Sequence, residues 1–181
     1  MAAGLGGVAA GCGGGPAGEP ATVAALAERL ADPLVVPELR LFNIELNTPP
    51  LPLHGDVLRR MHTNLESLWR RCQQVAAELE AAVALIGILP TLRLEDLTLE
   101  HMSAQQRYRA INEQILQRRR GRPMELAIHG AETLSLTHPD VMLEAATTSF
   151  QTHLQVAAPE AAAFFNAALA LAAPMVAVAA N

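Results

Sequence analysis

The chain has 181 residues, of which 51% are hydrophobic and 17% charged, and its net charge is −5. This length supports one domain with a substantial core, and the hydrophobic content excludes a globally disordered chain. All thirteen basic residues are arginine, so a Schiff-base lysine and the lysine of a phosphate-binding P-loop are both excluded.

The first twenty residues hold eight of the twelve glycines. They offer few side chains to bury, so we expect residues 1–20 to form a disordered tail and residues 21–181 to form one domain. The spacing of Gly4, Gly6 and Ala9 imitates a dinucleotide fingerprint, but no hydrophobic strand precedes it. The segment also lacks the charged start and the leucine-rich stretch of a secretory signal.

The first half of the domain is predicted to contain a short helix, a strand and a long helix. The short helix covers residues 22–30 and the strand residues 38–46, after which the prolines within residues 48–52 force a loop. The long helix is capped at Asp56 and runs to about residue 82. Its apolar residues recur at spacings of three and four, which predicts one buried face: Val57, Met61, Leu65, Leu68, Cys72, Val75 and Leu79.

The second half is predicted to alternate strands with a helix: strand 83–89, helix 103–118, strand 124–128, a loop or hairpin at 130–139, and strand 147–156. The only basic run follows the helix and consists of Arg118, Arg119, Arg120 and Arg122. Such a run fits either a phosphate or nucleic-acid patch or a solvated helix end. We favour the helix end, because arginine suits the helix dipole there and Gly121 and Pro123 then stop the helix.

The strand at 147–156 combines polar and apolar residues in alternation. Successive side chains of a strand point to opposite faces, so Gln151, His153 and Gln155 share one face. The other face carries Phe150, Thr152, Leu154 and Val156. We therefore predict one face that packs and one that binds.

The last helix begins at Pro159 and Glu160, residue types that suit a first helical turn. The residues that follow Glu160 are almost entirely apolar, so this last helix is either a transmembrane helix or a buried helix. Alanine dominates, Asn166 and Pro174 interrupt the run, and no basic flank follows, so we favour a buried helix that leads into a strand.

Four segments occur in the order found in one known family: LRLFNIELNTPP (39–50), GILPTLRLEDLTLEHMSAQQRYRAINEQI (87–115), RGRPMELAIHGAETL (120–134) and the run from Val141 to the C-terminus. They include Met102, separated by four residues from the Arg107–Tyr108 pair, and VMLEAATTSFQTHLQV at 141–156. On these motifs the chain resembles the glutamate-cysteine ligase family of ATP-dependent carboxylate-amine ligases.

The resemblance implies an α+β fold, with an antiparallel sheet and helices packed on one face, like an incomplete glutamine-synthetase-like catalytic domain. It also implies a reaction that joins the glutamate side-chain carboxylate to the amine of cysteine through an acyl phosphate, as in glutathione-type biosynthesis, using ATP and Mg²⁺. The partners implied are small-molecule substrates, glutamate and cysteine or another amine.

By the same resemblance, Glu45 and His153 are expected at the metal, and Gln151, His153 and Gln155 at the nucleotide. Carboxylate oxygens suit Mg²⁺, and imidazole can bind a metal or pair with phosphate. The residues alone also allow Glu45 to be a surface glutamate and His153 to be structural.

Arg107 and Tyr108 are the expected catalytic pair, because the planar fork of arginine matches a carboxylate or phosphate. The alternative is a surface arginine above a packed tyrosine. Asn43, Thr147 and Thr148 are expected to contact substrate, although hydrogen bonds to nearby backbone would explain them as well.

Two departures from the family bear on activity. The family begins with a strand that carries a Glu-x-Glu metal-binding pair, where this chain has its glycine-rich segment, and it continues past the equivalent of Asn181. We therefore expect a portion of a longer ligase, with a non-catalytic remnant that binds a partner or forms a homo-oligomer through an exposed sheet edge as the alternative. We expect no nucleic-acid partner and no membrane, and a cytoplasmic location, which the absence of a disulfide pattern suits.

Overall fold

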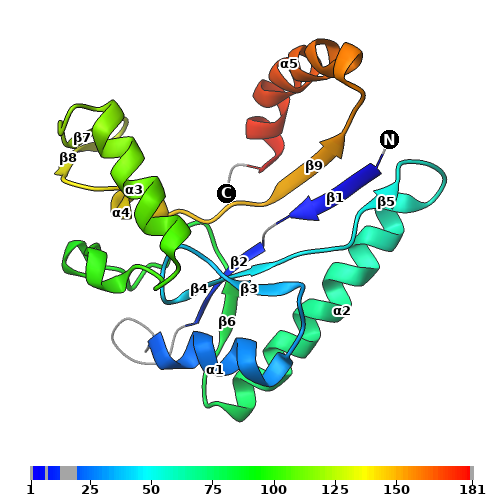
Figure 1. Ribbon diagram of the computed structural model, residues 1–181, viewed down its shortest axis with the longest axis horizontal. Coiled ribbons are helices and arrows are strands. Elements are labelled where there is room, and N and C mark those ends of the chain that lie inside the picture. Colours follow the sequence, from blue (N-terminus) through cyan, green and yellow to red (C-terminus); the bar gives the residue numbers. More distant parts are fainter. Residues whose placement is uncertain (1, 7, 13–19, 180–181) are drawn as a thin grey trace.

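The computed structural model describes residues 2–6, 8–12 and 20–179 (Figure 1). Helices and antiparallel strands alternate along the chain, and the predicted α+β class is confirmed.

In the described residues the strands form three small sheets. One has four strands, in the order β3 (Val35–Pro37), β4 (Asn43–Leu46), β2 (Val8–Cys12) and β6 (Val83–Leu85). Another has three, in the order β5 (Leu51–Pro52), β1 (Ala2–Gly6) and β9 (Gln151–Gln155). The last is a hairpin of β7 (Met124–His129) and β8 (Thr133–His138).

The glycine-rich segment supplies an inner strand to each of the two larger sheets. β2 pairs with β4 and β6, and β1 pairs with β5 and β9. Our prediction of a disordered tail is therefore wrong for residues 2–6 and 8–12, while residues 13–19 of that prediction lie outside the described residues. Sheet pairing uses backbone N–H and C=O groups, which glycine and alanine possess as fully as any residue. Side-chain content alone was the wrong criterion.

The strand predicted at residues 38–46 is instead a hairpin. β3 pairs with β4 so that Val36 lies opposite Glu45, and the chain reverses between them. The Asn43 N–H bonds to the Arg40 carbonyl at 3.1 Å and so closes the turn. This reversal brings together residues that a continuous strand would have separated.

Helices α1 (Pro20–Leu30) and α2 (Val57–Glu78) pack on one face of the four-stranded sheet. The predicted apolar face of α2 is confirmed: Met61 is buried in a separate cluster with Val57, and Leu68 and Cys72 are buried in the core between these helices and the sheet. The members of this core are Val23, Leu26, Leu30, Val35, Ile44, Leu46, Leu68, Cys72, Ala76 and Val83. Because alternate residues of β4 point to opposite faces, Ile44 and Leu46 enter this core and Glu45 points away from the helices. One face of the sheet is thus left free for a site, as predicted.

A second core joins α3 (Gln106–Arg118) and α4 (Met142–Ala145) to two single-turn 3₁₀ helices, Leu94–Asp96 and Leu99–His101. It contains Leu97, Met102, Tyr108, Val141, Met142 and Ala146. The arginines that follow α3 hydrogen-bond to backbone carbonyls, as Arg119 Nη2 does to Pro123 at 2.6 Å, which agrees with a helix end. This core holds α3 and α4 beside the free face of the sheet.

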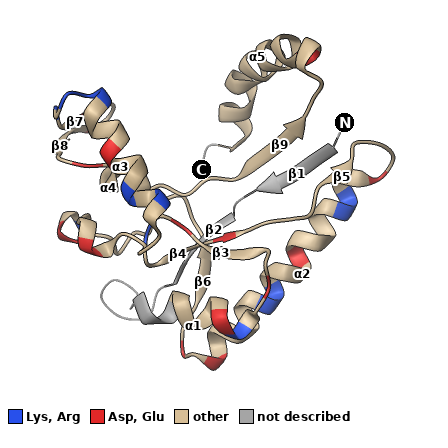
Figure 2. Ribbon diagram, viewed as in Figure 1, with Lys and Arg blue, Asp and Glu red and all other residues tan. Residues whose placement is uncertain are grey.

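Helix α5 (Ala161–Ala179) follows β9 through a turn at Ala158–Glu160 and stands away from the other elements (Figure 1). Figure 2 shows acidic colour only where the coil begins, and Ala161–Ala179 itself contains no charged residue. Within α5 as described no residue is buried. The buried helix that we predicted is therefore not observed. By length and composition alone, residues 158–179 are suited to cross a membrane, a property that core helices of soluble proteins share. The packing face predicted for β9 is also open, with Phe150 63% exposed and Leu154 46%.

Candidate functional site

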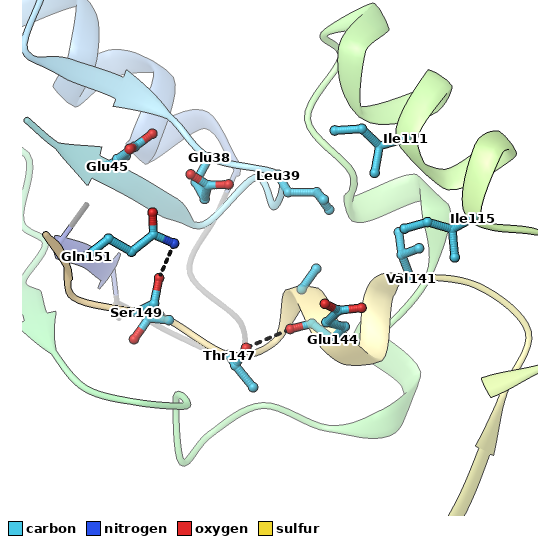
Figure 3. A pocket seen from close by; sticks show the side chains of 12 residues that line it. Glu38, Leu39, Glu45, Ile111, Ile115, Val141, Glu144, Thr147, Ser149 and Gln151 are labelled. Atoms are coloured by element: carbon cyan, nitrogen blue, oxygen red, sulfur yellow. Dashed lines mark hydrogen bonds between the residues drawn. The ribbon is translucent and has the colours of Figure 1, made fainter. Parts of the chain in front are cut away.

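A cavity of about 380 Å³ lies between the free face of the β3–β4 hairpin, helices α3 and α4, and the segment that leads into β9 (Figure 3). Its walls come from segments far apart in the sequence. The residues that line it are Glu38, Leu39, Glu45, Ile111, Ile115, Val141, Glu144, Ala145, Thr147, Thr148, Ser149 and Gln151. Pockets of this size commonly hold small-molecule ligands.

Glu38 and Glu45 form a carboxyl pair in one wall of this cavity. Both side chains line the cavity, and their carboxyl groups lie close enough to interact electrostatically. Burial and the nearby charge of Glu38 raise the pKa of Glu45, and Arg107 and His153 oppose this rise. Two carboxylates this close repel each other unless a proton or a cation lies between them. The pair therefore suits a cation.

The Arg107–Tyr108 pair at the start of α3 is attached to the same hairpin. The Tyr108 hydroxyl donates to the Pro37 carbonyl at 3.1 Å and accepts a hydrogen bond from Arg107 Nη2. The Arg107 guanidinium carbon lies 4.5 Å from the centre of the Tyr108 ring. Burial raises the pKa of Tyr108, as do the charges of Glu38 and Glu45, while Arg107 lowers it. Tyr108 is thus a buried support, and Arg107 is an exposed cation within electrostatic reach of the carboxyl pair.

The polar face of β9 extends the site toward β1. Gln151 Oε1 lies 3.2 Å from His153 Nε2, and Gln151 Nε2 donates to Ser149 Oγ at 3.0 Å. The register places Gly6 opposite Gln151 and Gly4 opposite His153. Gln151 lines the cavity. His153 is not among the lining residues described, but it interacts electrostatically with Glu45, which is.

Comparison with known proteins decides the family. The family model for glutamate-cysteine ligase family 2 matches residues 16–181. The chain belongs to this family. No curated protein and no solved structure matches it. Membership indicates a ligase-type enzyme that acts on small-molecule substrates.

The structure of this family 2 ligase chain brings most of the predicted site residues together. Glu45 and Gln151 line the cavity. Arg107 and His153 interact electrostatically with Glu45, and Tyr108 is hydrogen-bonded to Arg107. Gln155 is at the far end of β9, opposite Ala2, and is not among the described residues that line the cavity.

The predicted substrate contacts divide into two groups. Thr147 and Thr148 line the cavity, but their hydroxyls already donate to backbone carbonyls, Thr147 to Glu144 at 2.8 Å and Thr148 to Ile86. In the structure, these two hydrogen bonds hold the segment between α4 and β9 in place. Asn43 is only 2% exposed and lies outside the described lining, so the structure gives it no route to a substrate.

Glu38 is the site residue that sequence reasoning missed. In one continuous strand, residues seven positions apart face opposite sides, so Glu38 and Glu45 could not have met. The hairpin between β3 and β4 removes this restriction. Recognising a turn at Arg40–Asn43 would have revealed the pair.

The carboxyl pair fits Mg²⁺, which proteins commonly bind through one or two carboxylates together with phosphate oxygens and water. Glu38 and Glu45 would be the protein ligands, with His153 nearby. No group of three His, Cys, Asp or Glu side chains in the described part of the chain is arranged to hold a metal, so phosphate oxygens would complete the shell.

Proposed function

We propose that this chain carries part of the active site of a ligase that joins the side-chain carboxylate of glutamate to an amine, cysteine or another, with ATP and Mg²⁺. Phosphoryl transfer from ATP to the carboxylate gives an acyl phosphate, and the amine then displaces phosphate. The observation that carries this proposal is the Glu38–Glu45 pair, which faces a cavity and lies beside Arg107 and His153.

Each residue has a role that follows from its chemistry. Glu38 and Glu45 would hold Mg²⁺, which when bound supplies charge neutralisation for the phosphates. Arg107 presents a planar cation, which can orient a carboxylate or phosphate group. Gln151 and His153 provide hydrogen-bonding groups on one strand face, where a nucleotide phosphate would lie. Positioning and electrostatics of this kind provide most of the rate enhancement in phosphoryl transfer.

The test is calorimetric titration of Mg²⁺ and ATP into the full chain, with and without glutamate. Glu45→Ala and His153→Ala should each weaken binding at least about tenfold, since each removes a contact to metal or phosphate. Glu125→Ala, an exposed glutamate on β7, is the matched control and should bind as the wild type does. Unchanged binding in both site variants would refute the assignment.

A second candidate, association without catalysis, is favoured by the exposed α5 and by the edge of β9 that faces away from β1. Unpaired strand edges and apolar helices both invite contact with another chain. Concentration-dependent association in a chain that binds no nucleotide would support this candidate. For the ligase we further propose a cytoplasmic location and no nucleic-acid or membrane partner, in keeping with the net charge of −5.

A further inference from the structure

Three buried polar side chains lie behind helix α4 and take no part in the cavity lining. His138 ends β8, Asp140 comes just before α4, and Asn112 lies in α3. Each is at most 9% exposed, and none is among the lining residues described. Burying such groups is unfavourable unless hydrogen bonds replace their contacts with water. Their hydrogen-bond partners therefore indicate what they do.

Two of these side chains bind the backbone where α4 begins. The Met142 N–H donates to Asp140 Oδ1 at 2.9 Å, and the Val141 N–H donates to Asn112 Oδ1 at 3.3 Å. The first N–H groups of a helix have no partner within it, and a helix of four residues is not stable alone. Asp140 and Asn112 thus fix where α4 starts and how it lies against α3.

His138 holds Asp140 in place. Its Nε2 donates to the Leu97 carbonyl at 2.9 Å, since a carbonyl oxygen only accepts. Its Nδ1 lies 3.2 Å from Asp140 Oδ1 and 3.4 Å from the Asp140 backbone nitrogen, so the ring contacts Asp140 whether it is neutral or protonated. Leu97 belongs to the second core, and the start of α4 is therefore attached to a packed part of the chain.

The elements joined in this way form one side of the cavity. α3 and α4 meet at its aliphatic wall, which consists of Leu39, Ile111, Ile115 and Val141. Asn112 directly follows Ile111, so its bond to the Val141 N–H joins the two helices at this wall. The distance between α3 and α4 at the cavity thus depends on buried polar contacts as well as on apolar packing.

The segment that follows α4 depends on the same starting point. Figure 3 shows it running along the cavity from Glu144 through Ser149 to Gln151. The N–H and the hydroxyl of Thr147 both donate to the Glu144 carbonyl, at 3.1 and 2.8 Å, which attaches the segment to α4. A displacement of α4 would therefore displace Gln151, one of the proposed nucleotide contacts.

Resting on the ligase function proposed above, we propose that Asp140 and Asn112 are positioning residues of its active site, with His138 as the support of Asp140. They touch neither substrate nor metal. They hold α4 against α3, and so set the position of Gln151 relative to the carboxyl pair that would bind Mg²⁺.

The test compares Asp140→Ala with Asp140→Asn by calorimetric titration of Mg²⁺ and ATP, with glutamate, into the full chain. Alanine removes the acceptor of the Met142 N–H, and binding should weaken about tenfold, as is common when a residue that orients a ligand contact is lost. Asparagine keeps this oxygen and should bind within about twofold of the wild type. Unchanged binding in Asp140→Ala, or an equal loss in both variants, would overturn the inference.

Asp32→Ala is the matched control. Asp32 Oδ1 accepts the Leu34 N–H at 3.0 Å, a contact of the same kind two residues further along the chain, and Asp32 lies outside the cavity lining described. This variant should lower the urea midpoint of unfolding, as Asp140→Ala does, and leave Mg²⁺-ATP binding unchanged. An equal loss of binding in Asp32→Ala would show that reduced stability, and not position, weakens the ligand, and would overturn the inference.

Asn112→Ala keeps the test decisive if Asp140→Ala does not fold. It removes only the longer of the two bonds at the start of α4, and circular dichroism shows whether it is folded. Binding of Mg²⁺-ATP should weaken about threefold, in keeping with the loss of one hydrogen bond. Wild-type binding in folded Asn112→Ala would contradict the role of this contact.

Hydrogen exchange separates a failure of this inference from a failure of the ligase function. The amides of Ala145, Thr147 and Thr148 are hydrogen-bonded to backbone carbonyls, so their exchange reports on α4 and the segment after it. Binding that Asp140→Ala retains would overturn the positioning role and leave the ligase intact. If the wild type binds no ATP, the ligase is refuted. Faster exchange of these amides in Asp140→Ala, and not in Asp140→Asn or Asp32→Ala, would then still support the fixing of this wall, whereas equal exchange in all would overturn it.

Discussion

The side chain of Arg40 is fully buried, although arginine is among the residues least often found in an interior. Its carbon lies 4.4 Å from the centre of the Phe42 ring, and Nη2 donates to the Asp96 carbonyl at 3.4 Å. Nε and Nη1 have no hydrogen-bond partner among the described residues. Burial lowers the pKa of Arg40 to about 10, which Asp96 partly opposes. The guanidinium group thus loses its contacts with water, and hydrogen bonds within the protein replace only part of them.

Replacing Arg40 by methionine should therefore raise the free energy of unfolding, by about 1 kcal/mol, because a flexible apolar chain fills similar space without an unsatisfied charge. Urea denaturation followed by circular dichroism measures the change. Arg59→Met on the exposed side of α2 is the control and should shift stability by less than about 0.5 kcal/mol. A loss of stability in Arg40→Met would mean that the two nitrogens have partners, such as ordered water.

The carboxyl pair makes stability depend on pH in a defined direction. Burial and Glu38 raise the pKa of Glu45 in the folded chain above its ordinary value of 4.5. A group of this kind binds its proton more tightly when folded, so the stability it contributes is complete below the unfolded pKa and is lost as the pH rises through the folded pKa. Without divalent cations, the free energy of unfolding should therefore fall as the pH rises above 4.5, and Glu45→Gln should remove this part of the fall.

Added Mg²⁺ should offset the same loss in the wild type and not in Glu45→Gln, because a bound cation offsets the repulsion between the two carboxylates. Urea denaturation at a series of pH values, with and without Mg²⁺, measures both effects. Glu125→Gln should follow the wild-type profile. Parallel profiles for the wild type and Glu45→Gln would show that folding does not raise the pKa of Glu45.

Among the elements, those fixed by local periodicity were the most predictable from the sequence. The buried positions of α2 follow a helical repeat, and Val57, Met61, Leu68 and Cys72 are buried as predicted. The helix nevertheless ends at Glu78, before the predicted residue 82, because Glu80 adopts a positive φ of 56° that an α-helix does not allow.

Elements that depend on distant pairing were not predictable from side-chain patterns. β1 and β2 exist because other strands bond to their backbones, and the β3–β4 hairpin turns at residues without a glycine or proline signal. The candidate site shows the same division. Glu45, Arg107 and His153 could be selected by residue type and family motif, whereas Glu38 and the aliphatic wall required the folded arrangement.

At the scale of the whole molecule, α5 presents an apolar surface that no other described element covers. Its exposed side chains include Phe165, Leu169, Leu171, Met175, Val176 and Val178. Soluble monomers rarely expose a contiguous apolar patch of more than a few hundred Å². Because α5 is apolar on all sides, contact along one face would leave apolar surface on the other, so we expect it to associate with further copies of the chain.

Leu169→Glu combined with Val176→Glu places two charges two turns apart on one face of α5 and should shift the chain toward monomer. Sedimentation velocity across a wide concentration range measures this shift. Leu134→Glu, on the exposed surface of β8, is the control and should associate as the wild type does. Association that survives the double substitution would point to the open edge of β9 instead of α5.

Lipid is the other environment that suits an apolar helix of this length, and the same variants distinguish it from self-association. The interior of α5 contains Pro174, and its composition is dominated by alanine, which has little preference for a bilayer over water. We therefore expect the wild-type chain to remain in the soluble fraction when it is centrifuged with phosphatidylcholine vesicles. Sedimentation of the wild type with vesicles, abolished in Leu169→Glu with Val176→Glu, would assign α5 to the membrane and exclude self-association as the reason for its apolar surface.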